Sequence, residues 1–77
     1  MNKTRRKELE KLYEQLNDIV CTLCDLKDEE EDAYNNMPES LQYSERGEVM
    51  QENVDKMQEI IDALEEQQSA IDDLICC

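Results

Sequence analysis

The feature that most constrains this chain is the stretch from residue 3 to residue 36, which contains neither glycine nor proline. Apolar side chains recur there at steps of three and four residues, and the same rhythm returns from Glu45 onward. A seven-residue repeat keeps one stripe of a helix facing a partner, whereas a strand requires alternation by two. The repeat therefore predicts two long helices and an all-α fold. The residues assigned to the core or to an oligomer seam are Leu9, Leu12, Leu16, Ile19, Leu23, Leu26, Met50, Val54, Met57, Ile61, Leu64, Ile71 and Ile75.

The repeat is interrupted around Pro38. Asparagine tolerates the left-handed conformation that often ends a helix, and a residue before proline is pushed out of the helical region. Ser44 is a suitable N-cap for a second helix, since Glu45 and Glu48 follow it. We expect helices over about 4–36 and 45–75, joined by a connection over 37–44 with room for a short helical turn. A link this short favours an antiparallel hairpin, a single domain over residues 1–77.

Further apolar side chains lie beside the main stripe, among them Tyr13, Val20, Tyr34, Ile60 and Leu74. Three or more apolar positions per heptad are typical of a helix with more than one neighbour. The economical solution is a homodimer in which two hairpins pack as a four-helix bundle about a two-fold axis. The alternative is a monomer whose tyrosines cap the seam.

Two polar residues, Glu30 and Gln68, stand where the repeat calls for leucine. With the turn near residues 38–44, Glu30 should lie near Val54, and Gln68 near Leu16. A single polar group in such a seam commonly fixes register or oligomeric state at some cost in stability. That is the role expected of Gln68, while Glu30 lies in an acidic run that water can solvate.

The composition argues against an enzyme. The chain has no histidine and one glycine, Gly47, so it lacks an imidazole base, a histidine metal ligand and a glycine-rich phosphate loop. We expect no cofactor. Apolar runs fall far short of the ~18 residues of a membrane span, and the charged start does not resemble a signal peptide. These patterns predict a soluble cytoplasmic protein that binds no membrane.

The four cysteines form two pairs, Cys21 with Cys24 and Cys76 with Cys77. Four thiolates could close a zinc site, and the two-residue spacing also occurs in redox motifs. Within one hairpin, however, the pairs should lie about 21 Å apart at helical rise. We therefore expect no metal site. Cys21 and Cys24 remain the candidates for a thiol or zinc module, against the interpretation that they are unreactive surface side chains.

Charge is spread unevenly: residues 1–11 carry net +3 and residues 12–77 carry net −16. One interpretation is that the acidic surface keeps the protein soluble. The other is a DNA-mimic decoy, because a hairpin would carry one acid per ~2.6 Å and a pair of hairpins one per ~1.3 Å, while duplex DNA carries one charge per ~1.7 Å. The acidic field argues against direct nucleic-acid binding. If oligomers gathered the basic starts, they could hold a small anionic ligand such as a cyclic nucleotide.

The block at residues 36–48, Asn-Met-Pro-Glu-Ser-Leu-Gln-Tyr-Ser-Glu-Arg-Gly-Glu, followed by heptads such as Ile-Asp-Ala-Leu-Glu-Glu at 61–66, resembles a group of short acidic proteins. These are encoded by low-GC Gram-positive bacteria and their phages, and the resemblance covers nearly the whole chain. The group has no assigned activity, so no functional residue is carried over. The resemblance implies a phage or mobile-element setting, in which short acidic proteins often inhibit host defence systems.

Together these patterns predict a non-enzymatic interaction or inhibitor protein that dimerises and binds a protein partner. The alternatives are a decoy for a nuclease or defence complex with a basic nucleic-acid-binding groove, a sponge for a small anionic ligand, and a thiol or zinc module. Loops carry function more often than the elements they join. The side chains expected to face the partner are Tyr43, Arg46, Glu29, Glu31 and Asp32.

Overall fold

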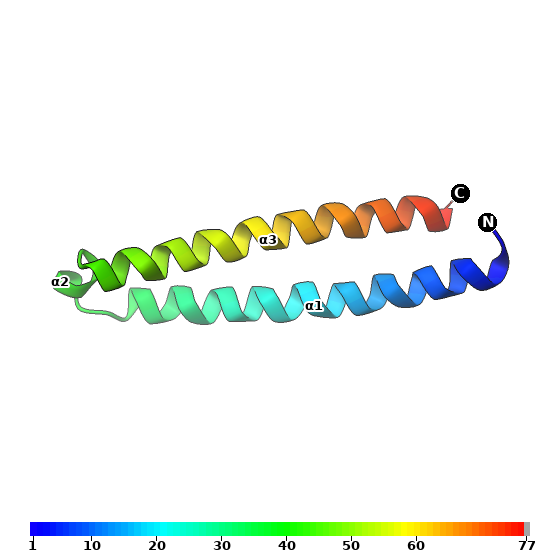
Figure 1. Cartoon of the computed structure of the whole chain (residues 1–77). Helices are drawn as coiled ribbons and strands as arrows, with labels where there is room; N and C mark the ends of the chain where they lie inside the picture. The colour runs from blue at the N-terminus through cyan, green and yellow to red at the C-terminus, as the bar shows by residue number, and fades with distance from the viewer. Residues whose placement is uncertain (77) are drawn as a thin grey trace.

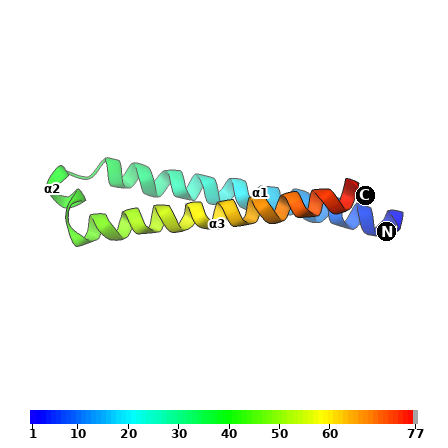
Figure 2. The same cartoon turned by 90° about the horizontal axis from the view of Figure 1, so that it is seen from above.

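The computed structural model describes residues 1–76 and is a rod measuring 59 × 14 × 12 Å. Its helices are α1 (Lys3–Asn35), α2 (Glu39–Gln42) and α3 (Glu45–Cys76), and the described residues contain no strand. The long helices run side by side in opposite directions, with α2 at the turn and both termini at the far end (Figure 1). Seen from above, α3 crosses over α1 towards the terminal end (Figure 2). The all-α hairpin is thus confirmed, and none of these helices combines the length and apolar content that a bilayer crossing requires.

Helix α1 is capped at its start by Asn2, whose side-chain oxygen accepts a hydrogen bond from the Arg5 amide at 2.8 Å. At its end, Asn36 has φ −87° in the right-handed region. Helix α1 therefore does not end in the left-handed conformation that the asparagines suggested, and no described residue has a positive φ. The Asn36 amide instead donates to the Asp32 carbonyl at 3.0 Å and the Met37 amide donates to the Tyr34 carbonyl at 3.1 Å, just before Pro38 forces the chain out of the helix.

The corner between the long helices, residues 36–48, is held by Gln42. Its side-chain amide donates to the carbonyls of Tyr34 at 3.0 Å and Met37 at 3.3 Å, which ties α2 to the end of α1. Its backbone lies against Gly47 so closely that a Cβ at position 47 would sit 2.1 Å from the Gln42 carbonyl oxygen. Glycine is required there by the close approach of two backbones, since no positive φ is involved.

Ser44 occupies the position before α3 and caps it, as predicted. The Gly47 amide donates to the Ser44 hydroxyl oxygen at 3.4 Å, and the Glu48 amide donates to the Ser44 carbonyl at 3.1 Å. The Ser44 hydroxyl in turn donates to the Leu41 carbonyl. Glu45 and Glu48 lie in the first turn of α3, where negative charge suits the positive end of the helix dipole.

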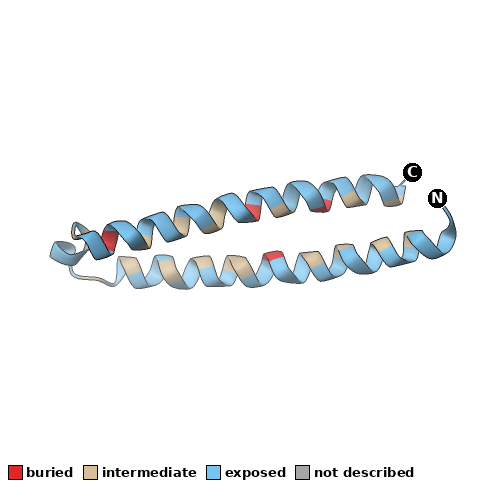
Figure 3. Ribbon diagram, in the orientation of Figure 1, coloured by how far each residue is buried: buried red, intermediate tan, exposed pale blue. Residues whose placement is uncertain are grey.

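The hairpin seam, the contact between α1 and α3, is only lightly buried (Figure 3). Val20 is 6% exposed and Ile61 is 2% exposed, and they are the buried hydrophobic residues in the described part of the chain. The remaining seam side chains are half-buried. Those from the predicted core set are Leu9, Leu16, Leu23, Met50, Val54, Met57, Leu64, Ile71 and Ile75.

Three other members of the predicted set, Leu12, Ile19 and Leu26, do not belong to the hairpin seam, because they are 52%, 56% and 49% exposed. The side chains that face α3 in their place are Tyr13, Val20, Lys27 and Tyr34, which are buried or half-buried. Helix α1 carries apolar residues at three positions of its heptad. A repeat of seven does not specify which two of the three turn towards the intramolecular partner.

Polar side-chain bonds join the two long helices at several described positions. Lys27 donates to Gln58 at 2.7 Å, Gln68 donates to Asn17 at 3.0 Å, and Asn53 donates to Glu30 at 3.2 Å. The two polar residues of the repeat therefore each have a polar partner. Their neighbours are also close to the expected ones, because Asn17 adjoins Leu16 in sequence and Asn53 adjoins Val54.

Candidate interaction surfaces

One flank of the hairpin presents large apolar side chains to solvent, and we call it the apolar flank. Its residues on α1 are one heptad apart, and its residues on α3 are two heptads apart. They are between 43% and 56% exposed. Its members are Leu12, Ile19, Leu26, Ile60 and Leu74.

Two grooves show that both helices contribute to this flank. At the terminal end a groove is lined by Met1, Leu9 and Leu12 of the N-terminal part, by the charged Arg5 and Glu8 beside them, and by Leu74 of α3. Nearer the corner, another groove joins Leu26, Glu29 and Glu30 of α1 to Met57 of α3. Both helices therefore contribute to this flank at the terminal end and near the corner.

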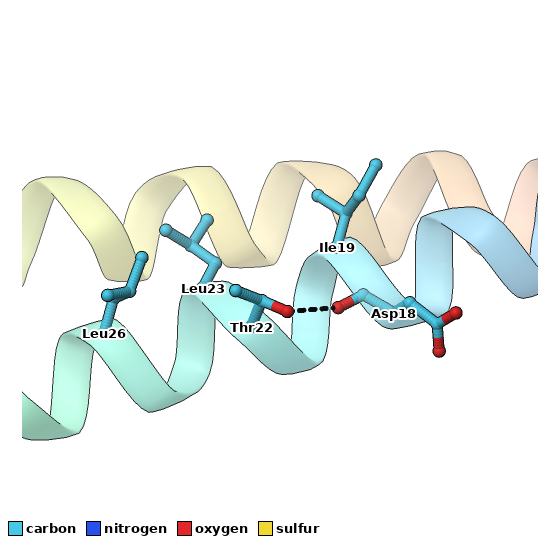
Figure 4. A pocket seen from close by; sticks show the side chains of 5 residues that line it. All are labelled: Asp18, Ile19, Thr22, Leu23 and Leu26. Carbon is cyan, nitrogen blue, oxygen red and sulfur yellow. Dashed lines mark hydrogen bonds between the residues drawn. The ribbon is translucent and has the colours of Figure 1, made fainter.

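A third groove, of about 350 Å³, lies in the middle of this flank on α1. Ile19, Leu23 and Leu26 line it together with Asp18 and Thr22, and in Figure 4 the three aliphatic side chains project from the same side of the helix. The Thr22 hydroxyl donates to the Asp18 carbonyl at 2.9 Å, so its hydrogen is already used within the helix. The groove thus offers aliphatic surface to an incoming side chain.

The opposite side of the hairpin is polar, and we call it the acidic flank. A groove joins Glu31 and Asn35 of α1 to Gln51 and Asp55 of α3 there. Further along α3, the Gln58 amide donates to Asp62 at 2.9 Å. Residues one or more heptads from these lie on the same side of their helix. The exposed carboxylates of the acidic flank are therefore Glu10, Glu31, Asp55, Asp62, Glu65 and Asp72.

The side chains predicted to face a partner are all exposed, but the structure does not gather them into one site. Tyr43 is 78% exposed beside α2, and Arg46 follows in the first turn of α3, so these two share the corner. Glu29 borders the apolar flank and Glu31 the acidic flank. Asp32 is exposed on the last turns of α1.

Cys21 and Cys24 lie one turn apart on α1, and Cys76 lies at the terminal end of α3. Cys21 and Cys76 are exposed, and Cys24 is half-buried, closer to the seam than its predicted outward position. Residues 1–76 contain no group of three His, Cys, Asp or Glu side chains that could hold a metal ion. Cys77 lies outside the described residues.

Comparison of the chain with protein-family models, with curated proteins and with solved structures gives no match. The resemblance of residues 36–48 to short acidic phage-associated proteins therefore stays a prediction. The structure supplies an independent physical reason for several residues of that block. Pro38, Gln42, Ser44 and Gly47 each make or permit a specific corner contact.

The division into an apolar and an acidic flank is the feature that the sequence pattern did not reveal. Ile60 and Leu74 stood out as extra apolar residues on one helix, and Leu12, Ile19 and Leu26 were assigned to the seam. That all five share one side follows only from the antiparallel direction and the register, which the Lys27–Gln58 and Asn17–Gln68 bonds define.

Proposed function

We propose that this chain is a non-enzymatic interaction protein that assembles as a homodimer through its apolar flank and binds a partner with a basic surface. One observation carries the proposal. Large aliphatic side chains gather on one flank of the hairpin, while carboxylates occupy the other. Exposed apolar surface gathered on one side of a protein usually marks an interface, so this asymmetry favours an assembly over a monomer.

The second copy is the occupant that the dimensions of the rod favour. If two copies pack along the whole side of the rod, which measures 59 × 14 Å, each copy buries on the order of 800 Å², the area of a stable interface. A two-fold pairing needs one self-complementary surface, which the apolar flank provides. Pairing would also enlarge a small core, because Val20 and Ile61 are the buried hydrophobic residues among those described.

The rest of the surface fits a basic protein partner. The chain carries net charge −13, and the acidic flank stays accessible when the apolar flanks pair. Complementary charge speeds encounter and selects partners. Tyr43 and Arg46 at the corner are of the types that most often dominate interface energetics, so we expect them to add specific contacts.

A decoy for nucleic acid is the second candidate, and charge spacing favours it. Twenty-one acids along 59 Å give about one per 2.8 Å for one hairpin, and a dimer doubles that density, against one per ~1.7 Å in duplex DNA. In this version the basic partner surface is a nucleic-acid-binding groove. Duplex DNA should then compete with the protein for that partner.

The dimer is tested by sedimentation equilibrium over a range of concentrations. We expect a dimer for the natural chain and a monomer for the triple variant Leu12→Gln, Ile19→Gln, Leu26→Gln, which should keep its helical circular dichroism because these residues lie outside the hairpin seam. The matched control carries three Gln substitutions on the acidic flank, at Glu10, Glu31 and Glu65, and should stay dimeric. A monomeric natural chain, or a triple variant that dimerises equally well, would overturn the proposal.

The basic partner is tested by passing a purified basic nucleic-acid-binding protein over the immobilised dimer in rising salt. We expect retention that falls as salt screens the charges, and that weakens when the acidic-flank carboxylates become amides. Added duplex DNA should displace the protein if the decoy version holds. Retention indifferent to both salt and amide substitution would contradict an electrostatic interface.

A further inference from the structure

The apolar flank is built in three layers across the two helices. The cross-helix bonds of Lys27 with Gln58 and of Asn17 with Gln68 define the register. In that register Leu12 lies opposite Leu74, and Leu26 lies opposite Ile60. The middle layer pairs Ile19 with Gln67, which is exposed. The flank is therefore symmetric in outline, because one aliphatic layer lies on each side of a mixed middle layer.

Two such flanks can meet about a two-fold axis in two ways. If the axis runs along the rod, both corners lie at the same end and α1 packs on α3 of the second copy. If the axis runs across the rod through the middle layer, the corners lie at opposite ends. Then α1 packs on α1 of the second copy, and α3 packs on α3. Both arrangements bring aliphatic layers together, so the choice depends on the middle layer and on charge.

We infer that the two copies pack with their corners at opposite ends, α1 against α1 and α3 against α3. This inference rests on the proposed dimer and specifies its geometry. Two independent observations favour it, the composition of the middle layer and the distribution of charge along the rod.

The middle layer discriminates because it holds one apolar and one polar side chain. With corners at opposite ends, Ile19 meets Ile19 of the second copy, and Gln67 meets Gln67 of the second copy. A glutamine amide both donates and accepts, so two of them can bond each other across the axis. With corners at the same end, each Ile19 covers a Gln67 amide instead, which loses water without gaining a polar partner.

Charge favours the same choice. The corner half of the hairpin, residues 28–55, has ten acids and one cation, Arg46, and so carries net −9. The terminal half, residues 1–27 and 56–77, carries net −4. Corners at opposite ends place each strongly acidic half beside a weakly acidic one, whereas corners at the same end oppose the two −9 halves. Like charges packed together destabilise an assembly, so the first arrangement has the lower electrostatic cost.

This geometry has a consequence for partner binding. The two corners, each with its Tyr43 and Arg46, would stand at the two ends of a rod about as long as one hairpin, 59 Å. The acidic flanks would form its two outer faces. A partner would therefore meet a two-fold particle with a contact site at each end, which one chain's single corner cannot provide.

Cysteine cross-linking distinguishes the two arrangements. In a background with Ser at positions 21, 24, 76 and 77, whose dimeric state is first checked by sedimentation, Ile19→Cys should form a disulfide-linked dimer. Held at the axis, it should react about a hundredfold faster than Glu65→Cys, an acidic-flank control that reacts only on collision. Leu12→Cys and Leu26→Cys should each cross-link slowly alone, and should form the mixed dimer when combined.

The outcomes separate the inference from the proposed function. Fast linkage of Ile19→Cys with itself supports corners at opposite ends. Fast linkage only in a mixture of Ile19→Cys with Gln67→Cys overturns that geometry and leaves the dimer standing. Linkage of all these variants no faster than Glu65→Cys overturns both, because the apolar flank would then not be the interface.

Discussion

The hairpin shaft and its corner are held together by different means. The shaft, α1 beside α3, depends on a repeat whose side chains are mostly half-buried, and no single contact dominates apart from the buried Val20 and Ile61. The corner depends on particular atoms, since Gln42 bonds two carbonyls and presses its backbone on Gly47. A repeated pattern tolerates exchange of one apolar residue for another, whereas a backbone contact tolerates almost none. In the shaft, the loss of stability on substitution should therefore depend on how deeply the side chain is buried. In the corner, it should depend on whether the new side chain fits the backbone contact.

The largest effect is expected in the shaft, at Ile61. Ile61→Ala removes a side chain that is 2% exposed and should lower the free energy of unfolding by about 3 kcal/mol. The measurement is urea denaturation in the monomeric triple-Gln variant, so that dimer contacts do not contribute. The matched control, Ile60→Ala, removes a side chain that is 43% exposed and should cost about 1 kcal/mol. Equal losses would show that α3 turns a different face to α1.

The corner is tested next by Gly47→Ala. An added Cβ would meet the Gln42 carbonyl oxygen at 2.1 Å, so the corner must shift, and we expect a loss of about 2 kcal/mol. Helix propensity alone predicts the opposite sign, a gain of about 1 kcal/mol. The neighbouring exposed position supplies the control, Glu48→Ala, which loses only a favourable charge near the start of α3 and should cost less than about 1 kcal/mol. A stabilised Gly47→Ala protein would mean that α2 does not pack on α3.

A smaller corner effect is expected from the cap of α3. Ser44→Ala removes the hydroxyl oxygen that accepts the Gly47 amide, and such caps contribute about 1 kcal/mol. Ser40→Ala, in exposed α2, changes the same atoms without a cap and should be close to neutral. Thermal melts of both variants followed by circular dichroism give the comparison. If the two variants melt alike, the cap contributes nothing to the corner.

The fold was predictable from sequence because its determinants are local. Heptad spacing, Pro38 and Ser44 act within a few residues, and the expected bounds of the two long helices differ from the observed ones by at most one residue. The flanks were not predictable in the same way. Leu12 and Val20 are equally apolar, and only the fit of α3 decides that Val20 turns inward and Leu12 outward.

Gly47 shows a different limit. As the only glycine it was evident in the sequence, but its presence inside a helical pattern gave no indication of what approaches it. The close contact arises because α2 folds back on α3, and that depends on the whole path of residues 36–48. Such a steric demand between two backbone segments leaves no periodic signal.

The smallest effect is expected from Gln68→Leu in the shaft, and its direction is opposite to the others. Gln68 is 8% exposed and bonds Asn17, which is itself exposed and can turn to water when the bond is lost. Replacing a satisfied polar seam residue by an apolar one of similar size should raise stability by less than about 1 kcal/mol. The same change removes one of the polar bonds that define register, so a cysteine pair placed at neighbouring positions of α1 and α3 should cross-link less selectively. A variant that is both less stable and equally selective would show that the Gln68–Asn17 bond contributes stability and leaves register to the apolar repeat.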